Sequence, residues 1–180
     1  MATPSAWVAR WAPLAPPGEV LDLACGSGRH ARLFAALGHP VLAIDRDSTA
    51  LAAAAGPGIT TLQHDLEDGA IPWPCAAGRF AAIVVTNYLH RPLMDSLVAS
   101  LAPDGLLIYE TFAAGNETWG KPSNPDFLLQ NGELLALAAA HGLGVIAFEE
   151  GVTGEPAQAM VQRLCARGAG FDRQRAHLTA

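Results

Sequence analysis

The sequence predicts a single-domain α/β protein with a mostly parallel seven-stranded sheet, a C-terminal antiparallel hairpin and helices on both faces. Three observations predict this fold class. Short apolar runs alternate with helical patterns through most of the chain. The first such run passes through a glycine-containing turn directly into a helical pattern, as VLDLACGSGRHA over 20–31. Two strand patterns follow one another near the C-terminus, where a helix would otherwise separate them.

The N-terminal segment 1–18 begins with a helical pattern over 5–12. Trp7, Val8 and Trp11 fall on one side of that helix, and prolines end it. We expect the segment to act either as a cap on the sheet or as a lid over a bound ligand.

Strands and helices then alternate regularly. Helix ends are indicated by Gly38, by Asp47 or Ser48 as a capping residue, and by the Gly-Pro-Gly run at 56–58. The elements expected in this half are strands at 20–23, 40–44 and 59–63 and helices at 29–37 and 48–55.

In the second half, 80–86 is a continuous apolar run of the kind that occupies the centre of a parallel sheet. The prolines of 69–78 argue against a helix there, and Pro103-Asp104-Gly105 indicates a turn. The expected elements are strands at 80–86, 106–111, 143–151 and 157–166, helices at 92–101 and 133–141, a long loop at 112–131 and a flexible tail at 168–180.

Composition excludes several classes of function. The 180 residues are 51% hydrophobic and 16% charged, which suits one folded domain. The net charge of −6 and the single lysine, Lys121, disfavour nucleic acid as a partner. Neither a membrane span nor a secretory pattern is visible, so we expect a cytoplasmic protein. We also expect a monomer or a homodimer. The cysteines and histidines show no metal-ligand spacing, and we expect no metal.

The glycine-containing turn marks the candidate site. Gly26 and Gly28 allow a ligand to approach the backbone, and the following helix start offers free N–H groups. Gly26, Gly28 and Ala31 satisfy the G-x-G-x-x-G/A pattern of dinucleotide-binding proteins, and Asp45 follows at the spacing of a ribose-binding acid. As a bare pattern, the motif is therefore ambiguous between nucleotide cofactors.

Asp22 within the strand and the wider D-L-A-C-G-S-G context resemble the first motif of class I S-adenosylmethionine-dependent methyltransferases. This resemblance implies a Rossmann-like methyltransferase domain over 19–167 and S-adenosyl-L-methionine as the cofactor. Ala24 replaces the usual first glycine of the motif. The cofactor-binding residues that the resemblance implies are Asp22, Ala24, Cys25, Gly26, Gly28, Asp45, Arg46, Asp65, Leu66 and Asn87.

The residues after the central strand have a second, narrower resemblance. Together with Glu110-Thr111-Phe112 and the loop 115–129, the stretch 87–92 (NYLHRP) is similar to a bacterial subgroup of tellurite-resistance-type methyltransferases. We expect a small-molecule methyl acceptor. The candidate catalytic residues are His90, as the first choice of base, with Tyr88 and Glu110 behind it. The loop is either an acceptor-pocket wall or a structural Ω-loop.

Two other functions remain open from the sequence. An NAD-dependent oxidoreductase would use the same glycines and Asp45, although the chain has no Tyr-x-x-x-Lys pair. A binding module that holds S-adenosylmethionine without turnover is the other interpretation, because the cofactor motifs are clearer than any catalytic one.

Overall fold

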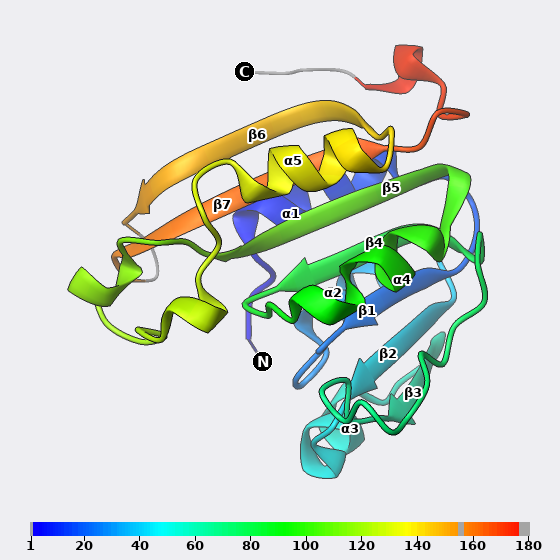
Figure 1. Ribbon diagram of the computed structural model, residues 1–180. Helices are drawn as coiled ribbons and strands as arrows, with labels where there is room; N and C mark the ends of the chain where they lie inside the picture. Colours follow the sequence, from blue (N-terminus) through cyan, green and yellow to red (C-terminus); the bar gives the residue numbers. More distant parts are fainter. Residues whose placement is uncertain (1, 155–156, 177–180) are drawn as a thin grey trace.

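The computed structural model describes residues 2–154 and 157–176, and its centre is one seven-stranded sheet (Figure 1). The strand order is β3-β2-β1-β4-β5-β7-β6. The first five strands are mutually parallel, and β7 runs antiparallel to both of its neighbours. The strands are β1 (Val20–Leu23), β2 (Val41–Asp45), β3 (Ile59–Gln63), β4 (Phe80–Thr86), β5 (Leu101–Phe112), β6 (Gly144–Thr153) and β7 (Ala159–Arg167).

Helices cover both faces of the sheet, as the sequence predicts (Figure 1). One apolar core lies under α4 and α5, and a second lies under α1, α2 and α3. The helices are α1 (Ala6–Trp11), α2 (Arg29–Ala36), α3 (Ser48–Ala54), α4 (Met94–Ala99) and α5 (Glu133–Ala140), and short 3₁₀ turns are η1 (Ala12–Leu14), η2 (Arg91–Leu93), η3 (Asn116–Thr118), η4 (Pro125–Phe127) and η5 (Arg173–Arg175).

The topology places a ligand site at one edge. From β1 the chain passes to β2 on one side, whereas β4 pairs with β1 on the other. This reversal of strand order opens a crevice at the carboxyl ends of β1 and β4, which is where open α/β sheets bind ligands.

One element differs clearly from the sequence-based expectation. The helix predicted to reach residue 101 ends at Ala99, and β5 begins at Leu101, so the turn predicted at 103–105 lies within the strand. The register between β4 and β5 shifts there, from Phe80 opposite Leu101 to Ala82 opposite Leu106. The predicted turn is therefore an irregularity in the strand, caused by residues that resist regular pairing.

Both terminal segments pack on the body of the domain. Trp7 and Trp11 of α1 are buried in the second core, so this helix packs on one face of the sheet. Phe171 is 4% exposed in the same core, and Gly168 N–H donates to Gly105 O at 2.9 Å. The tail predicted to be flexible is thus anchored over 168–176, and 177–180 lie outside the described residues.

Within the described part of the chain, we find no helix with both the length and the apolar character needed to cross a membrane.

Candidate functional site

The turn after β1 is held in an unusual backbone conformation. Ala24, Gly26 and Gly28 have φ of +52°, +52° and +75°, in the left-handed region that favours glycine. Gly28 N–H donates to Cys25 O at 3.0 Å and closes the turn. Burial raises the pKa of the Cys25 thiol to about 12, so the thiol stays protonated and acts as a small packing residue.

The two glycines of the turn have different surroundings. A Cβ on Gly28 would lie 2.6 Å from the Cβ of Ala54 and 2.9 Å from its Cα, so Gly28 permits α3 to pack against the turn. A Cβ on Gly26 would meet nothing within 4 Å. Gly26 therefore borders open space, where a ligand can approach the backbone.

Asp45 at the end of β2 connects the glycine turn after β1 to the turn that leads from β2 into α3. Its Oδ2 accepts from Gly26 N–H at 2.8 Å, and its Oδ1 accepts from Asp47 N–H at 3.0 Å. The carboxylate is half-buried and lines a cavity, so each oxygen keeps lone pairs for a further donor.

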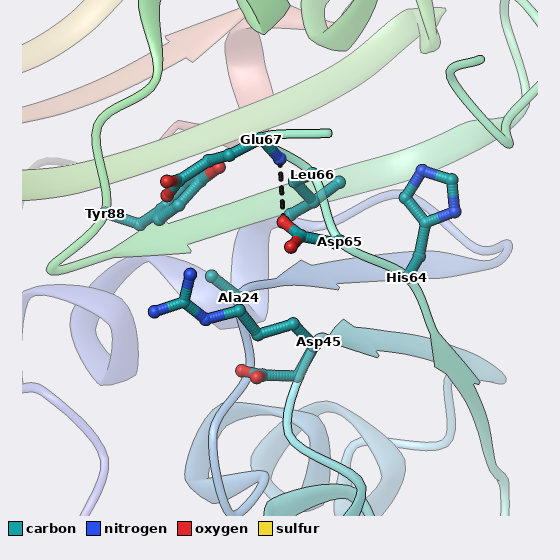
Figure 2. A pocket seen from close by; sticks show the side chains of 8 residues that line it. Ala24, Asp45, His64, Asp65, Leu66, Glu67 and Tyr88 are labelled. Carbon is teal, nitrogen blue, oxygen red and sulfur yellow. Dashed lines mark hydrogen bonds between the residues drawn. The ribbon is translucent and has the colours of Figure 1, made fainter. Parts of the chain in front are cut away.

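That cavity has a volume of about 200 Å³ and lies at the carboxyl ends of the strands. Figure 2 shows Asp45 on one side of it and the turn after β3 across from it. The Oδ1 of Asp65 accepts from Glu67 N–H at 3.0 Å, which fixes that turn. The lining residues are Ala24, Asp45, Arg46, His64, Asp65, Leu66, Glu67 and Tyr88.

Tyr88 contributes a buried hydroxyl to this cavity. It forms no hydrogen bond with any of the described residues. Burial, assisted by the carboxylates of Glu67 and Asp65, raises the pKa of Tyr88 above its ordinary value. The hydroxyl therefore stays protonated, and it is suited to donate to a ligand rather than to act as a base.

Asp22 lies under the turn rather than in the cavity. It is 1% exposed, and its Oδ2 accepts from Ala31 N–H at 2.8 Å in the first turn of α2. Burial raises the pKa of Asp22 to about 7, although the Ala31 hydrogen bond opposes this. Its position joins β1 to the start of α2 and so holds the glycine turn between them.

The raised pKa of Asp22 makes stability depend on pH. The folded protein retains a proton that the unfolded chain releases near pH 4, so ionisation of Asp22 destabilises the folded state as pH rises. We expect the free energy of unfolding to fall by up to about 4 kcal/mol between about pH 4 and pH 7, measured relative to Asp22→Asn. Urea denaturation of both proteins across this range measures the difference. A difference that does not vary with pH would contradict the assignment.

The three candidate catalytic residues are not brought together. His90 is half-buried just before η2, and Tyr88 lines the cavity. Glu110 lies beneath the N-terminal segment, where Ser5 Oγ donates to it at 2.8 Å and Arg163 Nε pairs with it at 2.6 Å.

Asn87, at φ +54°, donates its N–H to Glu110 O at 2.9 Å and is exposed.

Sequence reasoning overlooked several residues around the site. His64 and Glu67 line the cavity. Their place beside Asp65, directly after a strand, is a feature of the sequence that predicts such a position. His30 is 1% exposed; it accepts from Ser5 N–H at Nε2 and donates from Nδ1 to Thr86 Oγ1 at 3.4 Å. Burial lowers the pKa of His30 to about 3, so it remains neutral. No sequence pattern indicates this pairing.

Comparisons with solved structures show the same fold. TehB from Haemophilus influenzae superposes with a TM-score of 0.76 at 17% identity, covering 93% of this chain and 63% of that one. An S-adenosylmethionine-dependent methyltransferase from Mesorhizobium loti has a TM-score of 0.68 at 20% identity, covering 88% and 97%. The Burkholderia thailandensis 1,6-didemethyltoxoflavin-N1-methyltransferase has a TM-score of 0.65 at 21% identity, covering 93% and 77%.

A family model gives the classification, and one sequence relative matches part of the chain. Protein-L-isoaspartate O-methyltransferase from Chlorobaculum tepidum is 37% identical over 97 residues, which are 52% of this chain. The match spans only 44% of that relative. The model of the methyltransferase domain family matches residues 2–151, which include the glycine turn, Asp45 and the whole cavity. The resemblance noted in the sequence is thereby confirmed, and this chain belongs to the methyltransferase domain family.

Proposed function

We propose that this protein transfers the methyl group of S-adenosyl-L-methionine to a small-molecule acceptor. The observation that carries the proposal is the Asp45 carboxylate, which lines the cavity and is bonded to the N–H of Gly26, beside open space. A carboxylate in this position accepts from both hydroxyls of a ribose. Nucleic-acid exclusion, oligomeric state and cytoplasmic localisation stay predictions from the sequence.

Two features of the structure fit a nucleoside cofactor. The Tyr88 hydroxyl is buried in the cavity wall without a partner among the described residues, and a buried unpaired hydroxyl is costly unless a ligand completes its hydrogen bonding. The cavity, at about 200 Å³, is below the roughly 300 Å³ of pockets that enclose a whole small ligand. It therefore suits the adenine portion, with the rest extending over Gly26.

The binding roles follow from these positions. Asp45 would hold the ribose, and Asp65 with the N–H of Leu66 would meet the adenine edge. The backbone of 24–28 would hold the methionine end, with Asp22 holding that backbone from below through Ala31. When bound, the cofactor supplies an electrophilic methyl group on a positively charged sulfur.

This chain's residues then orient the acceptor and exclude water, which suffices for much of an in-line displacement at carbon. His90 follows the carboxyl end of β4 in the chain, at the N-cap of η2. It is the candidate group for accepting a proton from a protonated acceptor. Glu110 is less suited to that role, because Ser5 and Arg163 already occupy its oxygens. Tyr88 is assigned to binding.

A small-molecule acceptor is supported by one of the fold neighbours. The Burkholderia thailandensis enzyme is described with bound 1,6-didemethyltoxoflavin and S-adenosylhomocysteine, and its fold covers 93% of this chain. In this chain the loop that follows the carboxyl end of β5 carries two exposed aromatic side chains, Trp119 and Phe127. Such side chains are suited to contact a small apolar or planar acceptor.

Thermal denaturation with two ligands tests the proposed cofactor. At about 100 times its Kd, S-adenosylhomocysteine should stabilise the fold by about 2.7 kcal/mol, which raises Tm by roughly 5–10 °C for a domain of this size. NAD should cause no shift. A shift with NAD alone would instead select an oxidoreductase, and binding without label transfer from methyl-labelled cofactor to any metabolite would select a non-catalytic module.

His90→Ala separates the candidate base from the binding residues. We expect turnover to fall about 100-fold for an acceptor that must lose a proton, because general-base catalysis contributes at least this much. Affinity for S-adenosylhomocysteine should change less than about twofold, since His90 does not line the cavity. Initial rates with methyl-labelled cofactor and calorimetric binding provide the two measurements. Unchanged turnover would remove His90 as the base.

A further inference from the structure

Arg91 joins two parts of the chain that border the site. It is the first residue of η2, directly after His90. Its Nε and one terminal nitrogen donate to the two carboxylate oxygens of Glu133 at 2.7 and 2.8 Å. The same guanidinium donates to the carbonyls of Asp126 and Leu128, each at 2.9 Å. One side chain thus bonds to η4, to the segment after it and to the start of α5.

Glu133 is held on its other side as well. Gln130 N–H donates to its Oε2 at 2.7 Å. Burial alone would raise the pKa of Glu133, but the hydrogen bonds from Arg91 and Gln130 outweigh it and lower that pKa below the ordinary value. Glu133 therefore stays ionised, and the two-pronged pair with Arg91 persists across the neutral pH range.

Residues 113–131, here called the acceptor loop, are closed at their base. Leu129 N–H donates to Phe112 O, and Ala114 N–H donates to Leu129 O, both at 2.9 Å. Asn116, 1% exposed, donates from Nδ2 to Pro122 O at 2.9 Å and accepts from Met160 N–H at 3.1 Å. The two interpretations of this loop, a structural Ω-loop and a wall of the acceptor pocket, are therefore compatible, because hydrogen bonds fix the backbone while side chains of the same loop stay exposed.

The acceptor loop carries two exposed aromatic side chains. Trp119 and Phe127 are 45% and 46% exposed. Figure 1 shows the acceptor loop continuing beyond the tip of β5, and Arg91 at the start of η2 bonds to the carbonyls of Asp126 and Leu128 in that loop. Tyr109 Oη donates to Tyr88 O at 2.9 Å, so the chain between Tyr88 and Arg91 is fixed at both of its ends.

We propose that Arg91 is a positioning residue for methyl transfer. It holds the acceptor loop to residues 88–91, so that the loop carrying Trp119 and Phe127 and the segment carrying Tyr88 and His90 form one wall of the acceptor site. This inference rests on the proposed function. It assigns no chemical step to Arg91, which acts through the loop and through its neighbour His90.

The chain offers a matched control. Arg79 makes the same two-pronged pair with Glu19, at 2.8 and 3.0 Å, and the two arginine side chains are 37% and 38% exposed. Arg79 directly precedes β4, at the opposite end of that strand from the site. Arg79→Lys therefore changes an equivalent ion pair without touching the acceptor loop.

The test compares Arg91→Lys, Glu133→Gln and Arg79→Lys with the wild type. Lysine keeps the charge of Arg91, but it lacks the planar fork that reaches a carboxylate and two carbonyls together. We expect backbone amide exchange in 115–131 to be about tenfold faster in Arg91→Lys and Glu133→Gln and unchanged in Arg79→Lys. S-adenosylhomocysteine should slow this exchange in the wild type, because Tyr88 lines the cavity and lies three residues before Arg91, which bonds to the loop. It should fail to slow the exchange in Arg91→Lys.

Kinetics distinguish positioning from plain stabilisation. For any acceptor that takes up the methyl label, Arg91→Lys should raise the acceptor KM about tenfold while the Kd of S-adenosylhomocysteine changes less than about twofold. If S-adenosylhomocysteine does not bind the wild type, the proposed function fails and this inference fails with it. If it binds but loop exchange in Arg91→Lys equals that of the wild type, or does not respond to ligand in the wild type, only the inference on Arg91 is overturned.

Discussion

Asp45→Ala is expected to weaken binding of S-adenosylhomocysteine about 100-fold, because the two charge-assisted hydrogen bonds that we propose Asp45 makes to the ribose would be lost, at a combined cost of about 3 kcal/mol. The same carboxylate accepts from Gly26 N–H, so the glycine turn also loses an anchor. Asp45→Asn retains one acceptor oxygen and should weaken binding by about tenfold. Isothermal calorimetry on both variants measures the affinities.

Asp47→Ala is the matched control for this experiment. Asp47 lies two residues away and accepts from the N–H groups of Thr49 and Ala50, which makes it the N-cap of α3. It does not line the cavity. We expect a loss of about 1 kcal/mol of stability and no change in affinity. Wild-type affinity in Asp45→Ala, or an equal loss in both variants, would refute the ribose role of Asp45.

Gly28→Ala is expected to destabilise the fold by about 4 kcal/mol, the sum of left-handed backbone strain and overpacking. The added Cβ would lie 2.9 Å from the Cα of Ala54, so relief requires movement of the backbone of α3. Urea denaturation measures the loss. A destabilisation below about 1 kcal/mol would show that α3 moves freely and would contradict the packing role of Gly28.

Gly26→Ala should have a small effect on stability and a large effect on ligand affinity, the opposite of Gly28→Ala. Its φ of +52° costs the alanine variant about 1 kcal/mol, and no atom lies within 4 Å of the added Cβ. The methyl group would instead occupy the space assigned to the cofactor, so affinity for S-adenosylhomocysteine should fall at least about tenfold. Unchanged affinity would mean that the ligand does not approach the turn at Gly26.

The strand–turn–helix unit illustrates what local sequence determines. Mostly apolar runs of four to seven residues, separated by glycines and capping residues, specify β1, β2 and β4 with nearly the observed bounds. The partly exposed edge strand β3 (ITTLQ) is specified by its β-branched residues after a Gly-Pro-Gly turn. Because parallel strands end at one edge, Asp45, Asp65 and Tyr88 come together around the cavity without any further information. The start of β5 differs from the expected position because Pro103 and Gly105 favour turns locally, whereas pairing with β4 retains them in the strand.

Glu110 illustrates what local sequence leaves undecided. Alternation along β5 places Ile108 and Glu110 on the face covered by α1, and Tyr109 on the face covered by α4 and α5. Glu110 pairs with Arg163 because β7 inserts antiparallel beside β5, and it meets Ser5 because the N-terminal helix packs there. Residues distant in the sequence make both contacts. Tertiary packing, by supplying these partners, decided that this carboxylate is already paired, that His30 remains neutral and that Arg91 fastens the acceptor loop.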